Sequence, residues 1–268
     1  MVWNRELTRG QGTCQAAMVE TQRHENRVQL ADYRAHYRAD ADAIIDPEEL
    51  SPQRRASEYR RLQTLVRLLH LHSGERVLDI GCGSGWLAAL CSRSGARVRA
   101  MDIALHGVAG AKSRFPEVDS YQVGDIYHLC FESSSFDAVV LSEVVEHLED
   151  IPGALAEVRR GLQPAGRVLV SVPYRETIVQ HLCIHCNHLT PANAHLHSFD
   201  EDILGSFLAG QDLVPERFLL VNNKLLELGS FPHLSRRLPY WCWRWTDLFF
   251  NRTVGRPAFI CMLATRSG

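Results

Sequence analysis

The fold of this chain is decided by Val77–Trp86, which reads VLDIGCGSGW. A short apolar run containing the acid Asp79 is followed by three glycines at every second position. This pattern predicts a strand that stops, a turn of bare backbone and a helix that begins. Because glycine has no Cβ, Gly81, Gly83 and Gly85 allow the backbone to approach a ligand closely. The stretch therefore predicts a binding site for a nucleotide-like ligand.

Strands and helices alternate along the chain after this turn. Strands are expected at residues 76–80, 96–102, 119–125, 136–143, 166–173, 214–221 and 258–265. The alternation predicts an α/β fold, with a doubly wound, Rossmann-like sheet of seven strands. The sheet should be mostly parallel with an antiparallel last strand, and a small cap should cover the binding side. Residues 1–58 are expected to form a helical and loose N-terminal segment, and residues 59–268 the main domain.

Composition limits the classes of protein to which the chain can belong. It has 268 residues, 46% hydrophobic content and a net charge of −2, which suits one large α/β domain. The charge provides no global positive field for nucleic acid or anionic lipid. The first residues are polar and no apolar run is long enough for a membrane span, so neither a signal peptide nor a transmembrane helix is expected. Eight scattered cysteines favour a reducing, cytoplasmic location.

The spacing of the glycines and acids limits which ligands the turn can bind. The dinucleotide fingerprint needs a third glycine at position 86, which is Trp86, so a nicotinamide oxidoreductase is disfavoured. Asp79 would repel pyrophosphate and attract a cationic amine. Asp102 ends the second strand, where an acid accepts ribose hydroxyls. Asp125 with Ile126 ends the third strand and suits adenine. Amine, ribose and adenine together describe S-adenosylmethionine.

Five segments resemble the class I S-adenosylmethionine-dependent methyltransferases, in particular the quinone-biosynthesis-like subgroup. They read VLDIGCGSG, MDIA, GDIYHLCF, FDAVVLSEVVEHLED and LQPAGRVLVSVP, in the order and spacing of that family. The resemblance implies that the donor-binding residues are Asp79, Gly81, Cys82, Gly83, Gly85, Asp102, Ile103, Asp125, Ile126 and Ser142. It also implies methyl transfer to an oxygen or carbon of a small or lipid-linked acceptor. The rival interpretation is a non-catalytic binding protein that keeps the same fold.

The segment SEVVEHLED supplies the candidate catalytic residues Glu143, Glu146 and His147. His147 is the best candidate base for a hydroxyl acceptor, because imidazole titrates near neutral pH. Glu146 and His147 have a second interpretation, as residues that begin the next helix. A third comes from one branch of the family, the small-RNA 3′-end methyltransferases. There E-x-x-E-H and a later histidine hold a divalent ion for 2′-O-methylation of RNA, although this chain lacks a basic face.

Residues 181–199 are rich in histidine and cysteine and have no periodicity. Within them the pattern C-x2-C-x8-H-x-H places Cys183 and Cys186 before His195 and His197. Two thiolates and two imidazoles at such spacing predict a tetrahedral Zn²⁺ site on a loop at the rim of the active site. The alternative is a reduced pair of thiols with surface histidines.

The segment YWCWRWTDLFF, residues 240–250, carries the highest density of aromatic residues and lies in a cap insert at 222–256. Two interpretations are open. The aromatic side chains pack the cap against the sheet, or they form a pocket for a flat or lipid-like acceptor or a peripheral contact with a membrane. The nearby arginines suit an acceptor that carries a phosphate or carboxylate.

Overall fold

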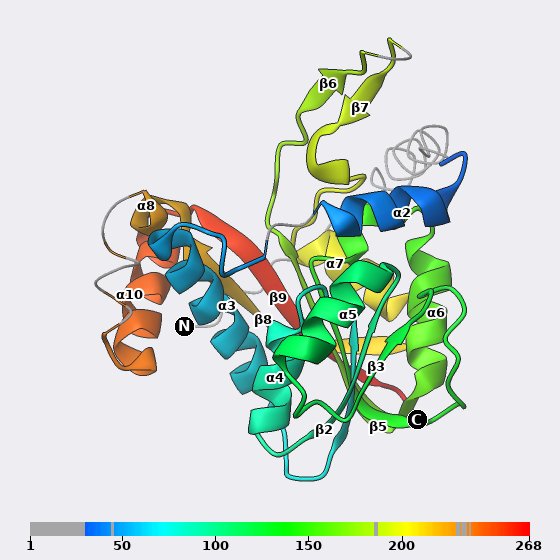
Figure 1. The fold of residues 1–268 in the computed structure, drawn as a ribbon. Coiled ribbons are helices and arrows are strands. Elements are labelled where there is room, and N and C mark those ends of the chain that lie inside the picture. The colour runs from blue at the N-terminus through cyan, green and yellow to red at the C-terminus, as the bar shows by residue number, and fades with distance from the viewer. Residues whose placement is uncertain (1–29, 44–45, 185–186, 229–230, 232–234, 236) are drawn as a thin grey trace, which may run out of the picture. The chain divides into compact units, whose positions relative to one another are not determined.

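A seven-stranded sheet lies at the centre of Asp32–Gly268, which form one unit (Figure 1). The computed structural model describes residues 30–43, 46–184, 187–228, 231, 235 and 237–268. The strands are β1 (Arg76–Ile80), β2 (Arg97–Asp102), β3 (Ser120–Val123), β4 (Phe136–Ser142), β5 (Leu162–Pro173), β8 (Leu213–Asn223) and β9 (Pro257–Arg266).

The strand order is β3-β2-β1-β4-β5-β9-β8, and the first five of these strands are parallel. The last strand of the chain, β9, runs antiparallel to both β5 and β8. The predicted mostly parallel sheet with an antiparallel last strand is therefore confirmed. Chain order reverses between β1 and β4, and open α/β sheets bind their ligands beyond the carboxyl ends of the strands at such a point.

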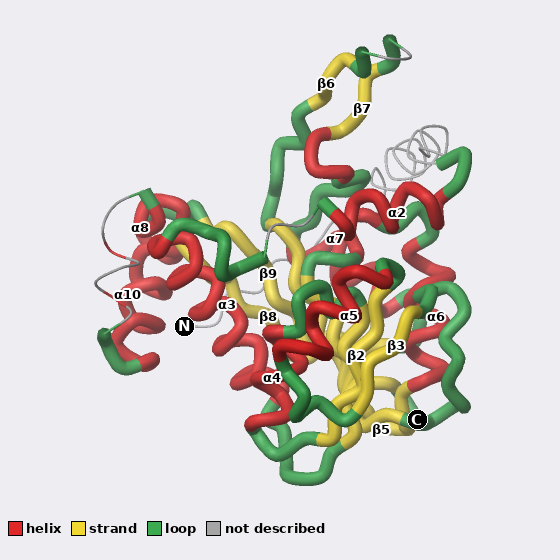
Figure 2. The backbone as a smooth tube through the Cα atoms, viewed as in Figure 1, coloured by secondary structure: helices red, strands yellow, loops and turns green. Residues whose placement is uncertain are grey.

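Helices cover both faces of the sheet (Figure 2). One core joins the sheet to α3 (Pro52–Leu69), α4 (Trp86–Arg93) and α10 (Tyr240–Thr253). The helix α6 (Ile151–Gly161) packs against β5. The helix α7 (Glu201–Ala209) packs against β8, β9 and α6. The helix α5 (Leu105–Arg114) contacts β2 and β3. None of the described helices is both long and apolar enough to cross a membrane.

Two segments differ from the sequence prediction. The N-terminal segment expected at residues 1–58 contains α2 (Tyr33–Asp42) and the start of α3, because Ser51 caps a second helix that begins at Pro52. The helix α3 runs across the boundary predicted at residue 58. Residues predicted to be aperiodic form a hairpin of β6 (Gln180–Leu182) and β7 (Leu189–Pro191), followed by the short helix η2 (Ala192–Ala194).

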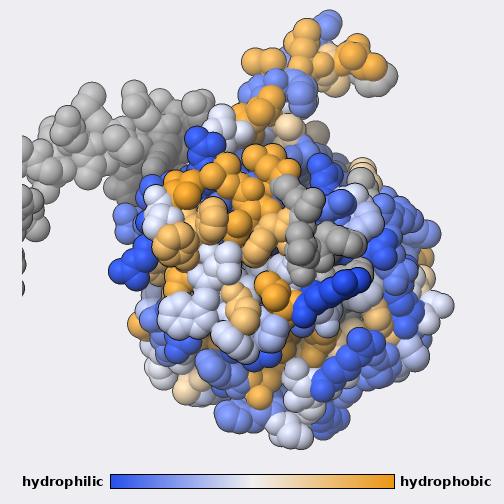
Figure 3. Space-filling model, turned by 90° about the vertical axis from the view of Figure 1, so that its left-hand side faces the viewer, coloured by the Kyte–Doolittle hydropathy of each residue, from blue (hydrophilic) through white to orange (hydrophobic). Residues whose placement is uncertain are grey.

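The aromatic segment is helical, so its alternating tryptophans lie on opposite faces of α10. Trp243 is 5% exposed, whereas Trp241 and Trp245 are 63% and 68% exposed. Residues two apart on a helix point in nearly opposite directions, while residues four apart share a face. Of the three tryptophans, only Trp243 therefore packs inward. The interpretation that the aromatic side chains pack the cap against the sheet applies to Trp243 and not to Trp241 or Trp245. Figure 3 shows the side of the molecule on which α10 and α8 (Lys224–Glu227) lie.

Candidate functional site

A cavity of about 100 Å³ lies at the carboxyl ends of β1, β2 and β4, where chain order reverses. Its lining includes seven of the residues predicted from the sequence. They are Gly81, Asp102, Ile103, Asp125, Ile126, Glu143 and His147. The helix α2 supplies a further wall through Tyr37, Asp40 and Ala41. The predicted residues Asp79, Cys82, Gly83, Gly85, Ser142 and Glu146 lie outside this lining.

The three glycines of the turn differ in what would prevent a larger residue at each position. All three have positive φ, which L side chains rarely adopt. A Cβ on Gly81 would lie 2.4 Å from Val144 Cγ2, and one on Gly85 would lie 2.8 Å from the Cβ of Ala111. A Cβ on Gly83 would meet no atom within 4 Å. Close packing of the chain on itself therefore explains Gly81 and Gly85, and only Gly83 faces open space.

Two buried acids lie at the turn. Asp102 accepts hydrogen bonds from the backbone N–H groups of Gly83 (2.8 Å) and Ala104 (3.0 Å), so it holds the turn in shape. Asp79 is 2% exposed. Burial, followed by the nearby charge of Asp102, raises the pKa of Asp79 to about 7. A cationic group near Asp79 would favour its ionised form.

Asp125 is already bonded to α2 in this structure. Its carboxylate accepts hydrogen bonds from Tyr33 Oη (2.8 Å), Arg34 Nε (2.9 Å) and the backbone N–H of Tyr127 (3.0 Å). Burial alone would raise the pKa of Asp125, but these donors lower it. This role of α2 was not predicted from the sequence. Tyr33 and Tyr37, four residues apart, were the available signal.

A buried arginine contacts side chains at the carboxyl end of β4. Arg61, on α3, donates to Ser142 Oγ (2.9 Å) and Ser171 Oγ (3.1 Å), and its Nη1 lies 3.4 Å from Glu143 Oε1. Burial raises the pKa of Glu143 to about 8, against the opposing effect of Arg61. Ser142 is thus engaged with Arg61. The role of Arg61 was not predicted from the sequence, because Ser142, Glu143 and Ser171 lie about 80 or more residues away.

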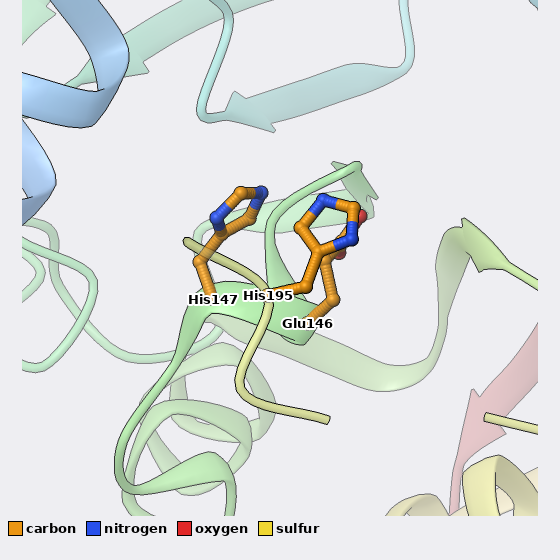
Figure 4. A group of neighbouring side chains, drawn as sticks. All are labelled: Glu146, His147 and His195. Atoms are coloured by element: carbon orange, nitrogen blue, oxygen red, sulfur yellow. The ribbon is translucent and has the colours of Figure 1, made fainter. Parts of the chain in front are cut away.

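Glu146, His147 and His195 form a cluster beside the cavity (Figure 4). Their ligand-type atoms lie within 4.8 Å of one another. Glu146 is fully buried, and neither of its carboxylate oxygens has a hydrogen-bond partner. Burial, and then the charge of Glu143, raises its pKa well above the ordinary value. The unsatisfied carboxylate and the two imidazoles fit a divalent cation or a shared proton.

A carboxylate lies beside each of the two histidines of this cluster. His195 Nδ1 bonds to a carboxylate oxygen of Glu176, and His147 Nδ1 lies 3.1 Å from the carboxylate of Asp40. The two imidazole rings are 4.8 Å apart and nearly perpendicular. His147 ends the short helix η1 (Val145–His147) and also lines the cavity.

The predicted zinc ligands are distributed over different elements. Cys183 follows β6, and its N–H donates to the carbonyl of His188 within the hairpin. His197 Nε2 lies 2.8 Å from the carbonyl oxygen of Leu148. Within the described part of the chain, the metal-type cluster contains His195 but not Cys183 or His197. Cys186 lies outside the described residues.

The sheet order, the glycine turn and the acids at the ends of β2 and β3 define the doubly wound class of nucleotide-binding proteins. Comparison with known proteins identifies the family within this class. Residues 78–170 match the family described as a methyltransferase domain. They form a class I S-adenosylmethionine-dependent methyltransferase domain.

Three relatives extend this match. A Mycolicibacterium smegmatis protein assigned as an S-adenosylmethionine-dependent methyltransferase is 39% identical over 120 residues, 44% of this chain and 46% of the relative. The malonyl-[acyl-carrier protein] O-methyltransferase of Serratia marcescens is 36% identical over 100 residues, 37% and 39% of the two chains. The ubiquinone biosynthesis O-methyltransferase of Xanthomonas oryzae is 37% identical over 108 residues, which cover 37% of this chain and 43% of the relative. The chain thus spans less than half of each relative.

A solved structure supports the fold over more of the chain. A chain in the complex between the Haloferax volcanii Trm112 methyltransferase activator and a methyltransferase aligns with a TM-score of 0.63. The alignment covers 88% of this chain and 98% of that one, at 16% identity. This likeness establishes the fold.

Proposed function

We propose that the protein transfers a methyl group from S-adenosylmethionine to an oxygen or carbon of a small or lipid-linked acceptor. The cavity at the ends of β1, β2 and β4 carries this proposal. It brings Gly81, Asp102 and Asp125 of the donor motifs to one place, with Glu143 and His147 in the same wall. Free thiols at Cys82, Cys91, Cys130, Cys242 and Cys261 support a reducing, cytoplasmic location.

The residues of the cavity fit the donor if α2 moves. Asp102 and Asp125 offer carboxylates to the ribose and the adenine amine. The open space at Gly83, just outside the lining, suits the methionine part. A cavity of about 100 Å³ is smaller than the roughly 300–1,000 Å³ of ordinary ligand sites. Since Tyr33 and Arg34 occupy Asp125, donor binding requires α2 to exchange these contacts or withdraw.

The donor, when bound, supplies an activated methyl group, and the protein aligns the acceptor and excludes water. His147 takes the proton of an acceptor hydroxyl, and the carboxylate of Asp40, 3.1 Å from its Nδ1, stabilises the positive charge that the ring then carries. Arg61 positions Glu143, whose carboxyl binds the acceptor beside the donor.

The identity of the relatives supports the class of acceptor. One is named for a malonyl group on acyl-carrier protein and another for ubiquinone biosynthesis, so carrier-linked and lipid-linked acceptors belong first in a screen. A net charge of −2 argues against nucleic acid.

The test is transfer of a labelled methyl group to such acceptors, followed by substitution of the base. His147→Ala should reduce transfer by about 10²–10⁴-fold while donor binding changes little. Glu132→Gln, at an exposed position, is the control. Donor binding without transfer to any acceptor would instead favour the non-catalytic binding protein.

A second candidate, metal-assisted O-methylation, is favoured by the cluster of Glu146, His147 and His195. It predicts that chelation abolishes transfer and that Mg²⁺, Mn²⁺ or Co²⁺ restores it. Glu146→Gln should remove this dependence together with the activity. Transfer that is indifferent to chelators would eliminate this mechanism, including its version with an RNA acceptor.

Zinc at Cys183, Cys186, His195 and His197 remains a separate proposal, for which the support is the sequence spacing. His195 cannot serve both ligand sets in its present position beside Glu146. Metal analysis of the purified protein distinguishes the two. Equimolar zinc that is lost in Cys183→Ser and kept in Glu146→Gln supports the cysteine set, and the reverse supports the cluster.

A further inference from the structure

The outward face of α10 is aromatic where a surface helix is ordinarily polar. Trp241, Trp245 and Phe249 are spaced four residues apart, so they lie along one side of the helix. They are 63%, 68% and 63% exposed, and Leu248 beside them is 37% exposed. Scattered exposed apolar side chains are ordinary, but a contiguous row of large aromatic residues indicates an interaction surface.

The inward face of α10 explains why the helix cannot rotate to bury this row. Trp243, Asp247 and Asn251, also four apart, are the buried residues of the helix. Asp247 accepts hydrogen bonds from the backbone N–H groups of Asn222 and Asn223 on β8. The polar inward contacts thus hold the aromatic row in solvent.

Neighbouring elements extend the apolar area. On α8 and just after it, Leu225 and Leu228 are 40% and 82% exposed, and Leu238, shortly before α10, is 41% exposed. Figure 3 shows hydrophobic side chains gathered on this side of the molecule. We call the exposed side chains of α8, Leu238 and the outward side of α10 the α8–α10 face.

The exposed charged side chains of the segments that form this face are all positive. In the described parts of residues 224–256, Lys224, Arg237, Arg252 and Arg256 are exposed. The two acids of these segments are engaged inside. Asp247 is buried and paired with Arg244, and Glu227 bonds to Ser57 Oγ. A chain with a net charge of −2 therefore exposes four positive and no negative side chains in the described parts of residues 224–256.

We propose that the α8–α10 face docks on the surface of a membrane that contains anionic phospholipid. Tryptophan and phenylalanine side chains favour the boundary between head groups and acyl chains. Lysine and arginine in the same segments are attracted to anionic head groups, and a helix with both features lies in the plane of the interface. The docking does not depend on the identity of the acceptor or on catalysis.

The helix α3 contacts both this face and the residues at the end of β4. Arg60 donates to the carbonyl groups of Ser235 and Leu238, and its guanidinium lies 5.8 Å from the centre of the Trp243 ring. The next residue, Arg61, holds Ser142 and Glu143 at the cavity. Docking through α8 and α10 would therefore place a lipid surface next to elements that pack on the helix whose Arg61 contacts Glu143.

A second copy of the chain fits this face less well. In a two-fold dimer the same surface meets itself, so the four exposed cations of one copy would face those of the other. The tip of the β6–β7 hairpin is a second apolar surface, with Leu182 and Leu189 62% and 66% exposed. It provides a matched control for removal of exposed apolar side chains.

The test is flotation of the full chain with vesicles of phosphatidylcholine alone or mixed with phosphatidylglycerol. We expect binding to the mixed vesicles that weakens as salt is raised. Replacing Trp241, Trp245 and Phe249 together with serine should reduce the partition coefficient by at least about tenfold. The pair Arg252→Glu and Arg256→Glu should reduce it at low salt, and Leu182→Ser with Leu189→Ser should leave it unchanged. Thermal unfolding of each variant verifies that it is folded.

Several results would overturn the proposal. These are absence of binding by the unaltered chain, equal binding to vesicles without anionic lipid, or full binding by the folded triple variant. Binding that is lost only in the hairpin variant would assign the contact to β6 and β7. Sedimentation of the chain as a dimer that the triple variant abolishes, without vesicle binding, would assign the face to a second copy.

Discussion

The β1–η1 region, residues 76–147, and the later region, residues 175–256, follow different rules. In the first, side chains predicted from separate strand ends converge on one cavity, because parallel strands all end at the same edge. In the second, histidines and tryptophans that are close in sequence separate onto a hairpin, a helix and the neighbourhood of η1. Short-range spacing therefore predicts geometry only where a regular element carries it.

The largest expected difference within the later region is between two tryptophans. Trp243→Ala should cost about 3–5 kcal/mol of unfolding free energy, because it empties a buried position beside Arg60. Trp245→Ala should change it by less than about 0.5 kcal/mol, since the side chain is exposed. Chemical denaturation of both variants measures the difference. Equal losses would contradict the opposite orientation of the two side chains.

In the β1–η1 region the sharpest comparison is between two glycines. Gly81→Ala should destabilise by about 2–4 kcal/mol, because its Cβ would meet Val144 at a positive φ. Gly110→Ala lies within α5, where a Cβ meets nothing within 4 Å. It should be neutral or stabilise by up to about 1 kcal/mol. A tolerated alanine at Gly81 would show that the turn is not packed against Val144.

The buried carboxyl of Glu146 predicts a dependence of stability on pH. Its pKa is raised in the folded state, so its stabilising contribution is full below the unfolded pKa of about 4.3 and is lost as pH rises. Glu146→Gln should therefore be more stable than the unaltered chain at pH 8, by at least about 1 kcal/mol, and nearly equal to it at pH 4.

Thermal unfolding across this range measures the effect, with Glu132→Gln as the control for the loss of an exposed carboxylate. A divalent ion bound by Glu146 would favour the ionised form and reduce the difference at pH 8. The same gap at both pH values would mean that Glu146 is not protonated in the folded chain.

The smallest expected effect concerns the closure of α2. Tyr33→Phe removes one of the three groups that donate hydrogen bonds to Asp125. The variant should bind S-adenosylmethionine more tightly, by a factor of about 2–10. Calorimetric titration measures it, with Tyr59→Phe, on the partly exposed face of α3, as the control. Weaker binding would indicate that Tyr33 contacts the donor.

Much of the β1–η1 region was predictable because hydrophobic periodicity and glycine spacing are local. The strand β4 and the ends of β2 and β3 were found where apolar runs meet acids. The role of Arg61 was not predictable, since its partners Ser142 and Ser171 lie far along the chain. The closure of α2 on Asp125 was missed for the same reason. The hairpin of β6 and β7 was missed because its strands are short and largely exposed.

The first measurement is calorimetric titration of the purified chain with S-adenosylhomocysteine, repeated with Asp102→Ala. Asp102 also holds Gly83 and Ala104, so thermal unfolding must show that the variant is folded. Asp119→Ala, which removes an exposed ion pair with Arg97, is the control. A donor site at the ends of β1 and β2 predicts micromolar binding that Asp102→Ala abolishes and Asp119→Ala preserves. Absence of binding by the unaltered chain, or equal affinity in the folded Asp102 variant, would contradict it.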